Sequence, residues 1–396
     1  MRLGIEIDCL QNKTIHRTGV FRHVLGLLTG LAQLDPRPEV TLYFRPFTAE
    51  GESRMRAVLL SQNVAFPIRR FYRPLGRPYN LRMRLNSWRA ALHRLDVFQV
   101  ITERNYRIYP AQLRAVLIPD LSVLHAPEHH TEENKILWRE MFEHAQNHAD
   151  LVVTYSEHTR LDVATNLGIP VEKIVAVPLA ADPCFRPLGE AEVRAKLLAW
   201  GLEYRRYLFT VSTIEPRKNH RALFRAYAQY RQRAGKDCLP LVVAGAPGWL
   251  HDEILAEPAR LGIAEAVRFV GRVEGLEYLY NGATAFVYPS LFEGFGLPPL
   301  EAMACGTPVV ASNATSLPEV VQDAGLMFDP LDDCALSEHI IRITSDPVLR
   351  EDLAARGLEV ARQFSWRRTA ELYVAALRNA AEQRNTVGKE VMSSCT

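Results

Sequence analysis

The sequence predicts an α/β protein made of two Rossmann-like domains that face a cleft. Short apolar and β-branched runs alternate with longer amphipathic stretches along both halves of the 396-residue chain. This alternation favours parallel sheets joined by helical crossovers, and a chain of this length has room for two or three domains. The composition, with 48% hydrophobic and 23% charged residues, excludes a disordered chain, a coiled coil and a collagen-like repeat.

Each half of the chain supplies one set of expected strands. In the first half, they cover residues 3–7, 40–44, 97–101, 115–118, 151–154 and 174–177. In the second half, they cover residues 207–211, 241–244, 267–270, 285–288 and 309–311. The amphipathic stretches between them, such as residues 190–200, 220–233 and 251–260, are predicted to be helices.

The domain boundary is expected where two prolines interrupt residues 182–188. We therefore assign residues 1–185 to an N-terminal domain and residues 186–366 to a C-terminal domain. A long Ala-rich helix at 367–385 crosses back to the N-terminal domain, and residues 386–396 are expected to be a disordered tail.

The cysteines and the N-terminus predict a cytoplasmic protein. The six cysteines are sparse and show no C-x-x-C spacing, which disfavours a zinc site or a disulfide framework. Glu6 and Asp8 interrupt the first apolar run, so that run does not suit a signal peptide. No run of 18 apolar residues is present to span a membrane.

Positive charge is concentrated in one segment, from Arg54 to Arg114. It holds 13 arginines and two acids, a charge of +11, although the whole chain carries only +2. Aromatic residues lie among these arginines, a pattern suited to an anionic membrane surface or a phosphate-bearing substrate, and also to RNA. A solvated Arg-rich helix face remains the alternative. Because the whole chain is nearly neutral, we expect no nucleic-acid partner.

A glycine-rich turn carries the strongest chemical signal. The predicted strand at 285–288 runs into residues 293–301, Glu-Gly-Phe-Gly-Leu-Pro-Pro-Leu-Glu, where a helix is expected to start near Pro298 or Pro299. Such a turn exposes backbone N–H groups to an anion, and Gly294 and Gly296 let a phosphate or sugar approach closely. Glu293 and Glu301 can accept hydrogen bonds from vicinal hydroxyls; a first-turn acid that complements the helix dipole is the alternative for Glu301.

This stretch resembles the signature of the family-four retaining glycosyltransferases of GT-B fold, and other segments agree with it. Residues 210–219 resemble the family's strand followed by a basic phosphate-binding loop, and residues 18–22 resemble its N-terminal loop and first helix. The short segments 153–156, which ends in a serine, 317–321 and 364–366 also match the family's sequence. The resemblance covers nearly the whole chain. It implies transfer of a sugar from a nucleotide diphosphate, with retention and without a metal. It also implies that residues 1–185 form the acceptor-side domain and residues 186–366 the nucleotide-sugar-binding domain.

The resemblance also implies roles for individual residues. Lys218 and Arg217 would hold the phosphates, Glu301 the ribose and Glu293 the donor sugar. The backbone amides of Phe295, Gly296 and Leu297 would surround the sugar and distal phosphate, and Gly19 would allow close approach from the N-terminal side. No metal or other cofactor is expected, because no Asp-x-Asp pair lies in a suitable loop and Asp332 and Asp333 are predicted to cap a helix.

The sequence departs from the family pattern at three places. Phe21 stands where relatives often have a second glycine, two residues after Gly19. Ser212 stands where many relatives have an arginine, so we assign Ser212 to the donor site and expect Arg217 to substitute. Pro119 and Asp120 replace the usual His-Asp pair. Asp120 is predicted to contact the acceptor or act as a weak base, with His125 as a less favoured stand-in and a turn-capping role for Asp120 as the alternative.

The segments around 215–219 and after Asp120 resemble bacterial mannosyltransferases that build O-antigen (lipopolysaccharide) or exopolysaccharide. They favour GDP-mannose as donor and a saccharide acceptor, lipid-linked at the inner face of the membrane, with the enzyme bound peripherally. UDP-glucose and a GDP-deoxyhexose remain alternative donors. A sugar-nucleotide epimerase on the same fold and a non-catalytic membrane scaffold are the alternative functions.

Overall fold

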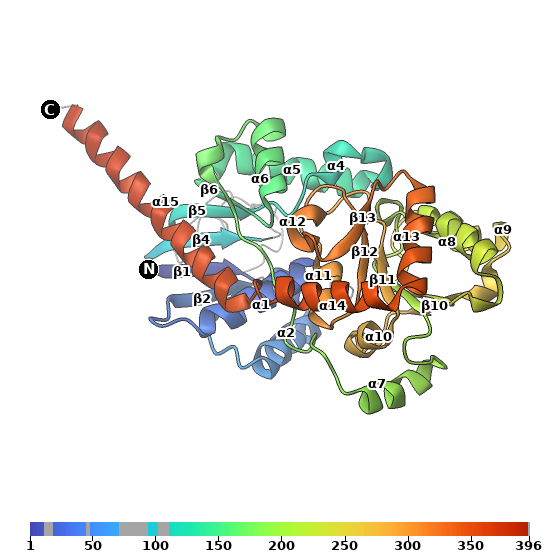
Figure 1. The fold of residues 1–396 in the computed structure, drawn as a ribbon. Coiled ribbons are helices and arrows are strands. Elements are labelled where there is room, and N and C mark those ends of the chain that lie inside the picture. Colours follow the sequence, from blue (N-terminus) through green and yellow to red (C-terminus); the bar gives the residue numbers. More distant parts are fainter. Residues whose placement is uncertain (12–18, 45–47, 71–93, 102–110, 395–396) are drawn as a thin grey trace. The chain divides into compact units, whose positions relative to one another are not determined.

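The computed structural model describes residues 1–11, 19–44, 48–70, 94–101 and 111–394, and beyond Arg384 only the backbone of the last helix. The chain divides into two compact units. The first comprises Met1–Leu121, Ile136–Leu179 and Ser365–Thr396, and the second Ser122–Lys135 and Ala180–Phe364. Each unit contains one sheet whose strand pairs are all parallel, so the prediction of two Rossmann-like α/β domains is confirmed (Figure 1).

The sheet of the first unit has seven strands in the order β3-β2-β1-β4-β5-β6-β7. Their bounds are β1 (Arg2–Glu6), β2 (Glu39–Phe44), β3 (Ile68–Arg70), β4 (Leu95–Val100), β5 (Ala111–Leu117), β6 (Leu151–Thr154) and β7 (Ile174–Ala176). Six correspond to expected strands. The edge strand β3 was not predicted, because two of its three residues are exposed arginines and it has no apolar run.

Helices flank this sheet. They are α1 (Gly19–Ala32), α2 (Ala49–Ser61), α5 (Glu132–His148), α6 (Glu157–Leu167) and the long α15 (Trp366–Ser394). The last helix packs on α1, because Gly26 and Gly30 leave room for Trp366: a Cβ on either glycine would lie about 2 Å from atoms of that tryptophan. Within the first unit the helix also reaches the sheet, where Tyr373 Oη donates to Gln99 Oε1 at 3.0 Å.

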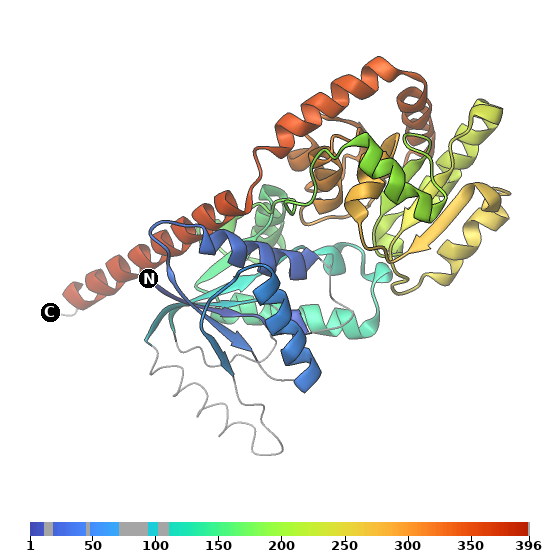
Figure 2. The same cartoon turned by 90° about the horizontal axis from the view of Figure 1, so that it is seen from below.

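The C-terminal end of the chain differs from expectation. The helix was predicted to end at residue 385 and to be followed by a disordered tail, but α15 continues to Ser394 (Figure 2). The return of this helix to the first unit agrees with the prediction. The extension was missed because residues 384–396 show no apolar periodicity. Few of these residues have a low helix propensity, however, and extending an existing helix is easier than nucleating one.

The sheet of the second unit has six strands in the order β10-β9-β8-β11-β12-β13. Their bounds are β8 (Leu208–Val211), β9 (Leu241–Ala244), β10 (Val267–Gly271), β11 (Ala285–Tyr288), β12 (Val309–Ser312) and β13 (Gly325–Phe328). This order is that of a Rossmann sheet, with the direction of winding reversing between β8 and β11. The loops that follow these two strands therefore diverge at the carboxyl edge, where such sheets bind ligands.

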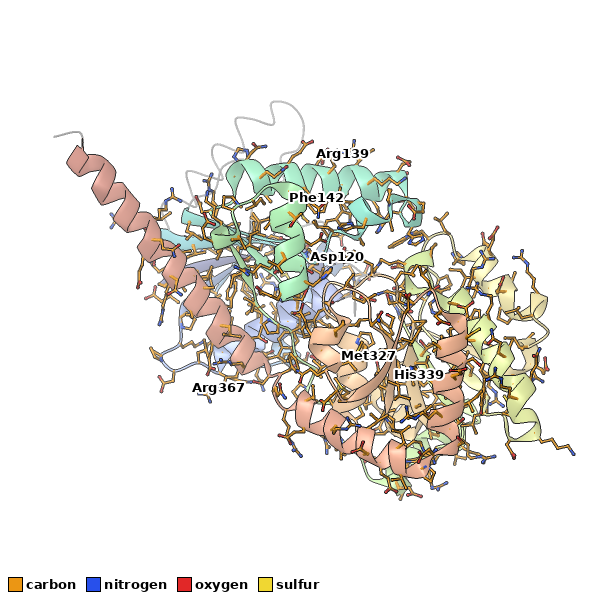
Figure 3. The ribbon with its side chains drawn as sticks, turned by 45° about the horizontal axis from the view of Figure 1, so that its top comes forward. Asp120, Arg139, Phe142, Met327, His339 and Arg367 are labelled. Carbon is orange, nitrogen blue, oxygen red and sulfur yellow. The ribbon has the colours of Figure 1, made fainter. Side chains whose placement is uncertain are left out.

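The helices of this unit are α4 (Ser122–His125), α7 (Glu190–Leu197), α8 (His220–Ala234), α9 (Asp252–Arg260), α10 (Leu276–Gly282), α11 (Leu297–Ala304), α12 (Leu317–Val321), α13 (Asp333–Ser345) and α14 (Pro347–Ala361). Asp332 caps α13 by accepting from Ala335 N at 2.9 Å, as predicted. His339 of α13 reaches the carbonyl of Met327 in β13 at 3.1 Å, and both residues are labelled in Figure 3.

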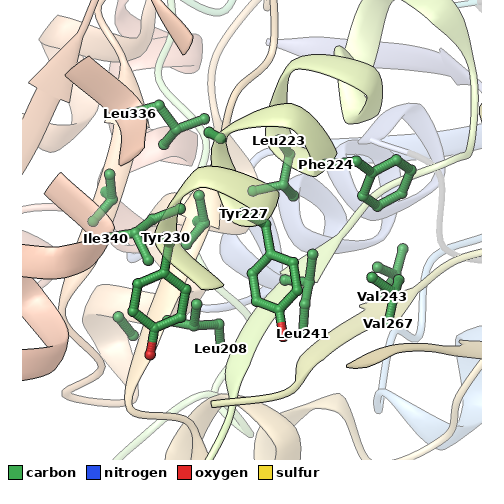
Figure 4. Packing of buried hydrophobic residues seen from close by; sticks show 14 of the residues in the cluster. Leu208, Leu223, Phe224, Tyr227, Tyr230, Leu241, Val243, Val267, Leu336 and Ile340 are labelled. Carbon is green, nitrogen blue, oxygen red and sulfur yellow. The ribbon is translucent and has the colours of Figure 1, made fainter. Parts of the chain in front are cut away.

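The core of the second unit forms where α8 lies on the sheet. Leu223, Phe224, Tyr227 and Tyr230 recur at helical spacing and are at most 2% exposed. They pack against strand residues and against α13, as Figure 4 shows. The hydroxyl groups of the two buried tyrosines have hydrogen-bond partners: Tyr227 Oη donates to Leu239 O at 2.8 Å, and Tyr230 Oη accepts from Leu239 N at 3.1 Å. This packing fixes the start of α8, which follows directly on the loop after β8.

The division of the chain differs from the predicted boundaries in two places. The chain passes into the second unit between Leu179 and Ala180, before the proline-rich stretch that marked the expected boundary at 185. In addition, Ser122–Lys135 belongs to the second unit. The reason is tertiary packing, because Trp249 Nε1 donates to His129 O and the His125 ring stacks on Phe292.

Among the described residues, no helix is long and apolar enough to cross a bilayer.

Candidate functional site

Two loops meet at the carboxyl edge between β8 and β11. After β8, the chain makes a 3₁₀ turn, Pro216–Lys218, and Asn219 takes a left-handed conformation with φ of 56°. Leu291 N donates to Arg217 O at 2.9 Å, and Asn219 Nδ2 donates to Pro289 O at 3.1 Å. These bonds hold the basic turn against the glycine-rich loop, although about 70 residues separate them in the sequence.

Lys218 and Glu293 form a close ion pair at this junction. The Lys218 Nζ atom lies 2.5 Å from Glu293 Oε1, and the two side chains are only 10% and 11% exposed. Tyr288 Oη donates to the same carboxylate oxygen at 2.7 Å. The pair thus places a cation and an anion, each with limited contact to water, where the two loops meet.

Arg217 is held by the protein on several sides. Its NH1 atom donates to Phe292 O at 2.7 Å and lies 3.6 Å from Glu293 Oε2. Its NH2 atom pairs with Glu215 Oε1 at 2.8 Å, and Glu215 is 2% exposed. The guanidinium of Arg217 therefore anchors the glycine-rich loop, and its predicted contact with a phosphate stays a prediction.

The electrostatics of the pair keep Glu293 ionised. Burial alone would raise the pKa of this carboxyl, but the charges of Lys218 and Arg217 outweigh burial and lower its pKa to about 2. The pKa of Tyr288 is raised far above its usual value by burial and by the nearby Glu293 carboxylate. At neutral pH, Tyr288 is therefore a hydrogen-bond donor to a carboxylate.

The backbone of the glycine-rich loop is fixed by hydroxyl groups from the segment before α12. Thr315 Oγ1 donates to Glu293 O and accepts from Glu293 N, both at 2.9 Å. Ser316 Oγ lies 2.9 Å from Glu293 O and 2.8 Å from Phe295 O. The loop is thus rigid before any ligand arrives, which is a requirement for preorganised electrostatic stabilisation.

Gly296 is required for a reason that the sequence did not reveal. It adopts φ of 123°, and a Cβ atom there would lie 2.8 Å from Leu317 Cδ2. The missing side chain makes room for a leucine of the same unit, and the approach of a ligand to the backbone of Gly296 stays a prediction. Gly294 has no positive φ, and its predicted ligand contact stays a prediction.

Glu301 lies deeper than expected. Helix α11 begins at Leu297, so Glu301 is in its second turn, and the alternative of a first-turn acid complementing the helix dipole is wrong. The side chain is 1% exposed and accepts from Tyr280 Oη at 2.9 Å. Phe295 and Leu297 are also buried. The assignment of Glu301 to a ribose stays a prediction.

Ser212 lies just after β8 and contacts a histidine that the sequence did not single out. Its Oγ atom is 3.2 Å from His220 Nε2. His220 is 1% exposed, and burial, aided by the charge of Lys218, lowers its pKa to about 4. Tyr288, Thr315, Ser316 and His220 were all missed, because only their tertiary contacts, not their spacing in the sequence, connect them to the site.

The remaining candidates are distributed over both units. Gly19 is the exposed first residue of α1, and Asp120, labelled in Figure 3, follows β5; both belong to the first unit. Burial is the main cause that raises the pKa of Tyr155, and the charges of Cys9 and Asp120 add to it. His125 belongs to the second unit, and its ring stacks on Phe292 at 5.4 Å, next to Glu293.

Part of the positive charge between Arg54 and Arg114 is neutralised by acids outside that segment. Arg70 and Arg56 both pair with Glu52, at 2.7 and 3.0 Å. Arg54 and Arg114 pair with acids at residues 50 and 150, each at 2.8 Å. Arg69 is exposed, whereas Arg73 and Arg77 lie outside the described residues.

Comparison with known proteins finds glycosyltransferases similar to both halves of the chain. Residues 200–360 match the family model described as glycosyl transferases group 1, and residues 17–184 match glycosyltransferase family 4. The chain is 41% identical to O-antigen chain mannosyltransferase B of Escherichia coli over 250 residues, which are 62% of this chain and 65% of that protein. It is 33% identical over 240 residues to the serotype-specific mannosyltransferase WbdA of Escherichia coli, covering 57% of this chain and 28% of WbdA.

The matched regions thus span less than two thirds of the length of these curated relatives. Among solved structures, HepE of Anabaena in complex with UDP and glucose superposes with a TM-score of 0.76 at 18% identity, over 96% of this chain and all of HepE. WaaG, a glycosyltransferase involved in lipopolysaccharide biosynthesis, superposes with a TM-score of 0.67 at 14% identity, over 94% of this chain and 98% of WaaG. At these identities, the superpositions show the fold alone.

Proposed function

Since this chain belongs to the family-four glycosyltransferases of GT-B fold, we propose that it is a retaining hexosyltransferase that acts on a nucleotide-diphosphate sugar. The observation that carries the proposal is the Lys218–Glu293 pair at the switch point between β8 and β11. The ammonium group supplies charge for a leaving diphosphate, and the carboxylate supplies an acceptor for the hydroxyls of the donor sugar.

The chemistry relies on positioning and charge stabilisation. When the bond from the anomeric carbon to the diphosphate breaks, negative charge grows on the leaving oxygen. Lys218, Arg217 and the amides at the start of α11 are arranged to stabilise that charge. The hexose passes to an acceptor hydroxyl, whose proton must be taken up; Asp120 is our candidate for contact with the acceptor. We propose that no metal takes part, because cations and amides can perform its role here.

For the donor we propose GDP-mannose. The support is the similarity to two mannosyltransferases of Escherichia coli, one of which is named for the O-antigen chain. A UDP-hexose is the second candidate, supported by the fold shared with HepE, which was solved with UDP and glucose. A GDP-deoxyhexose is a third donor to test. The alternative function, a sugar-nucleotide epimerase, differs from a transferase because it would convert the nucleotide sugar without any acceptor.

For the acceptor we propose a lipid-linked saccharide in cell-surface polysaccharide assembly, at the cytoplasmic face of the membrane. The enzyme would bind that surface peripherally through the segment from Arg54 to Arg114, where Arg69 is exposed. Each basic residue near an anionic bilayer contributes about 1 kcal/mol, and salt screens this attraction. Because several arginines of the segment are paired, we expect modest binding.

The test uses the full chain with GDP-mannose, UDP-glucose and GDP-fucose, each with and without octyl α-mannoside. We expect nucleoside diphosphate release that depends on the acceptor and is fastest with GDP-mannose, and nuclear magnetic resonance should show the α configuration in the product. Conversion of the donor without an acceptor into an epimeric nucleotide sugar would instead establish the epimerase. Inversion at the anomeric carbon would refute the retaining mechanism.

A further inference from the structure

A cavity of about 540 Å³ adjoins the basic turn and lies entirely within the second unit. Pro216 and Asn219 of the turn line it, as does Leu291 of the glycine-rich loop. Lys218 and Glu293 do not line it, so the cavity is separate from their ion pair. Its volume is in the range of pockets that bind small molecules.

The charged side chains in the cavity wall balance one another. Arg221, Arg225, Asp252 and Glu253 all line the cavity, so the cationic and anionic side chains are equal in number. Arg221 lies 3.4 Å from Glu253, and Arg225 pairs with Asp333 at 2.5 Å. A phosphate group would need an excess of cations, and a metal ion an excess of carboxylates. The balance favours an uncharged ligand.

The wall combines hydrogen-bonding groups with apolar ones. Guanidinium groups only donate and carboxylates only accept, whereas a hydroxyl does both, so a ligand rich in hydroxyls can use the two kinds of group together. Pro216, Leu250, Ile254 and Leu291 supply apolar surface. A sugar ring presents both hydroxyls and apolar C–H faces, and this lining matches that combination.

His220 adds a polar atom that the protein does not use. The side chain lines the cavity and is 1% exposed, and its Nδ1 atom has no hydrogen-bond partner in the described chain. Its Nε2 atom is 3.2 Å from Ser212 Oγ. If the serine hydroxyl donates to Nε2, the neutral ring carries its proton on Nδ1. A buried donor without a partner is costly, so this ring has an unused hydrogen-bonding group in a residue that lines the cavity.

We propose that this cavity is a subsite for an uncharged sugar unit of the saccharide acceptor, at a distance from the hydroxyl that reacts. The proposal rests on the glycosyl transfer proposed above. It assigns part of acceptor recognition to the second unit, through Arg221, Arg225, Glu253 and His220. The enzyme then favours an acceptor long enough to reach both the transfer site and this cavity.

The test compares octyl α-glycosides that carry one, two and three mannose units, with GDP-mannose as donor. In the wild type we expect the acceptor KM to fall about tenfold or more once the saccharide reaches the cavity, a factor that corresponds to about 1.4 kcal/mol. Leu250→Trp fills the cavity from a side chain that is 57% exposed, so the larger ring need not disturb the core. This variant should lose the advantage of the longer acceptors.

Arg221→Ala should act like Leu250→Trp, because it removes donors from the wall. Arg233→Ala is the matched control, since Arg233 is an exposed arginine near the other end of the same helix, and its acceptor KM values should equal those of the wild type. Acceptor KM values that do not depend on saccharide length in the wild type would overturn the subsite. So would a length dependence that Leu250→Trp leaves unchanged.

A binding experiment separates this proposal from the proposed function. Saturation-transfer difference spectra of mannotriose with the full chain report on the cavity whether or not transfer occurs. Signals that Leu250→Trp abolishes and Arg233→Ala retains would support the subsite even if no donor were active. Mannotriose signals of equal strength in wild type and Leu250→Trp, or none in the wild type, would overturn the subsite while transfer to octyl α-mannoside still upheld the enzyme.

Discussion

Replacing Lys218 by alanine removes the cation closest to Glu293 and, in the proposed mechanism, the main charge opposite the leaving diphosphate. We expect kcat to fall and the donor KM to change little, because negative charge on the diphosphate grows chiefly in the transition state. Loss of one such stabilising donor typically lowers kcat by about 10²–10³-fold. If Lys218 contacts the diphosphate, Lys218→Ala should therefore abolish nearly all transfer.

The structural cost of the same substitution can be estimated from the ion pair. The pKa of Glu293 lies near 2 instead of 4.5, which corresponds to about 3 kcal/mol of net stabilisation of the ionised carboxylate by its surroundings. Burial opposes this stabilisation, so the cations supply more than the net value, and removing one partner of a buried ion pair typically costs about 3–5 kcal/mol. Arg217, 3.6 Å from the other oxygen, and Tyr288, which donates at 2.7 Å, keep the cost toward the lower end of that range. A domain that is stable by about 5–15 kcal/mol remains folded after such a loss.

The assay measures nucleoside diphosphate release at saturating donor, together with urea unfolding. Lys236→Ala is the control, because Lys236 is an exposed lysine remote in sequence from the loop, and its kcat and stability should equal those of the wild type. The double variant Lys218→Ala with Glu293→Gln also removes the carboxylate that has lost its lysine partner and should recover part of the lost stability. Turnover of Lys218→Ala within a few-fold of wild type would refute the reasoning.

Four other outcomes are expected. Glu301→Ala should raise the donor KM more than it lowers kcat, because a ribose contact is similar in ground and transition states; an unchanged donor affinity in calorimetry, with Glu319→Ala as exposed control, would remove Glu301 from the nucleotide site. Transfer should survive excess EDTA, and a loss that Mg²⁺ restores would contradict the metal-free mechanism. The protein should co-sediment with anionic but not neutral vesicles, be released by salt and bind less after Arg69→Ser; equal binding to both vesicle types would favour a merely solvated face. The pKa of Glu293 is lower in the folded chain, so its contribution to stability is complete above about pH 4.5 and is lost as the pH falls toward 2; Glu293→Gln should flatten that part of the stability curve, and parallel curves for variant and wild type would contradict the ion pair.

The sequence predicted the alternation of strands and helices and the two loops of the site. Buried parallel strands leave continuous apolar runs, so β8, β9, β11 and β12 were visible, but β3 and β13 were not. β3 is two-thirds arginine, and β13 is short, begins with glycine and is incompletely buried. Short edge strands lack the signal that burial on both faces imposes.

Within the site, the residues that carry charge were predictable and those that position them were not. Lys218 and Glu293 stand in unusual local patterns, whereas Thr315 and Ser316 are common residues whose role appears only when their hydroxyls reach Glu293 O. Gly296 was identified, but its reason lies in Leu317, some twenty positions later in the chain. Local sequence contains no record of such long-range contacts.

The packing of Trp366 against Gly26 and Gly30 has a consequence for the order of folding during synthesis. Trp366 is 6% exposed and covers α1, so the first unit cannot bury that face until the ribosome has made residues beyond 365. The second unit is itself complete only at Phe364, two residues before Trp366, so neither unit can finish folding before almost the whole chain has been made. At about 5–20 residues per second, synthesis from Leu179 to Trp366 takes about 10 to 40 seconds, and α1 keeps an open apolar face during that time. Nascent chains stalled before residue 365 should accordingly expose α1 to proteolysis, whereas the released full-length chain should protect it.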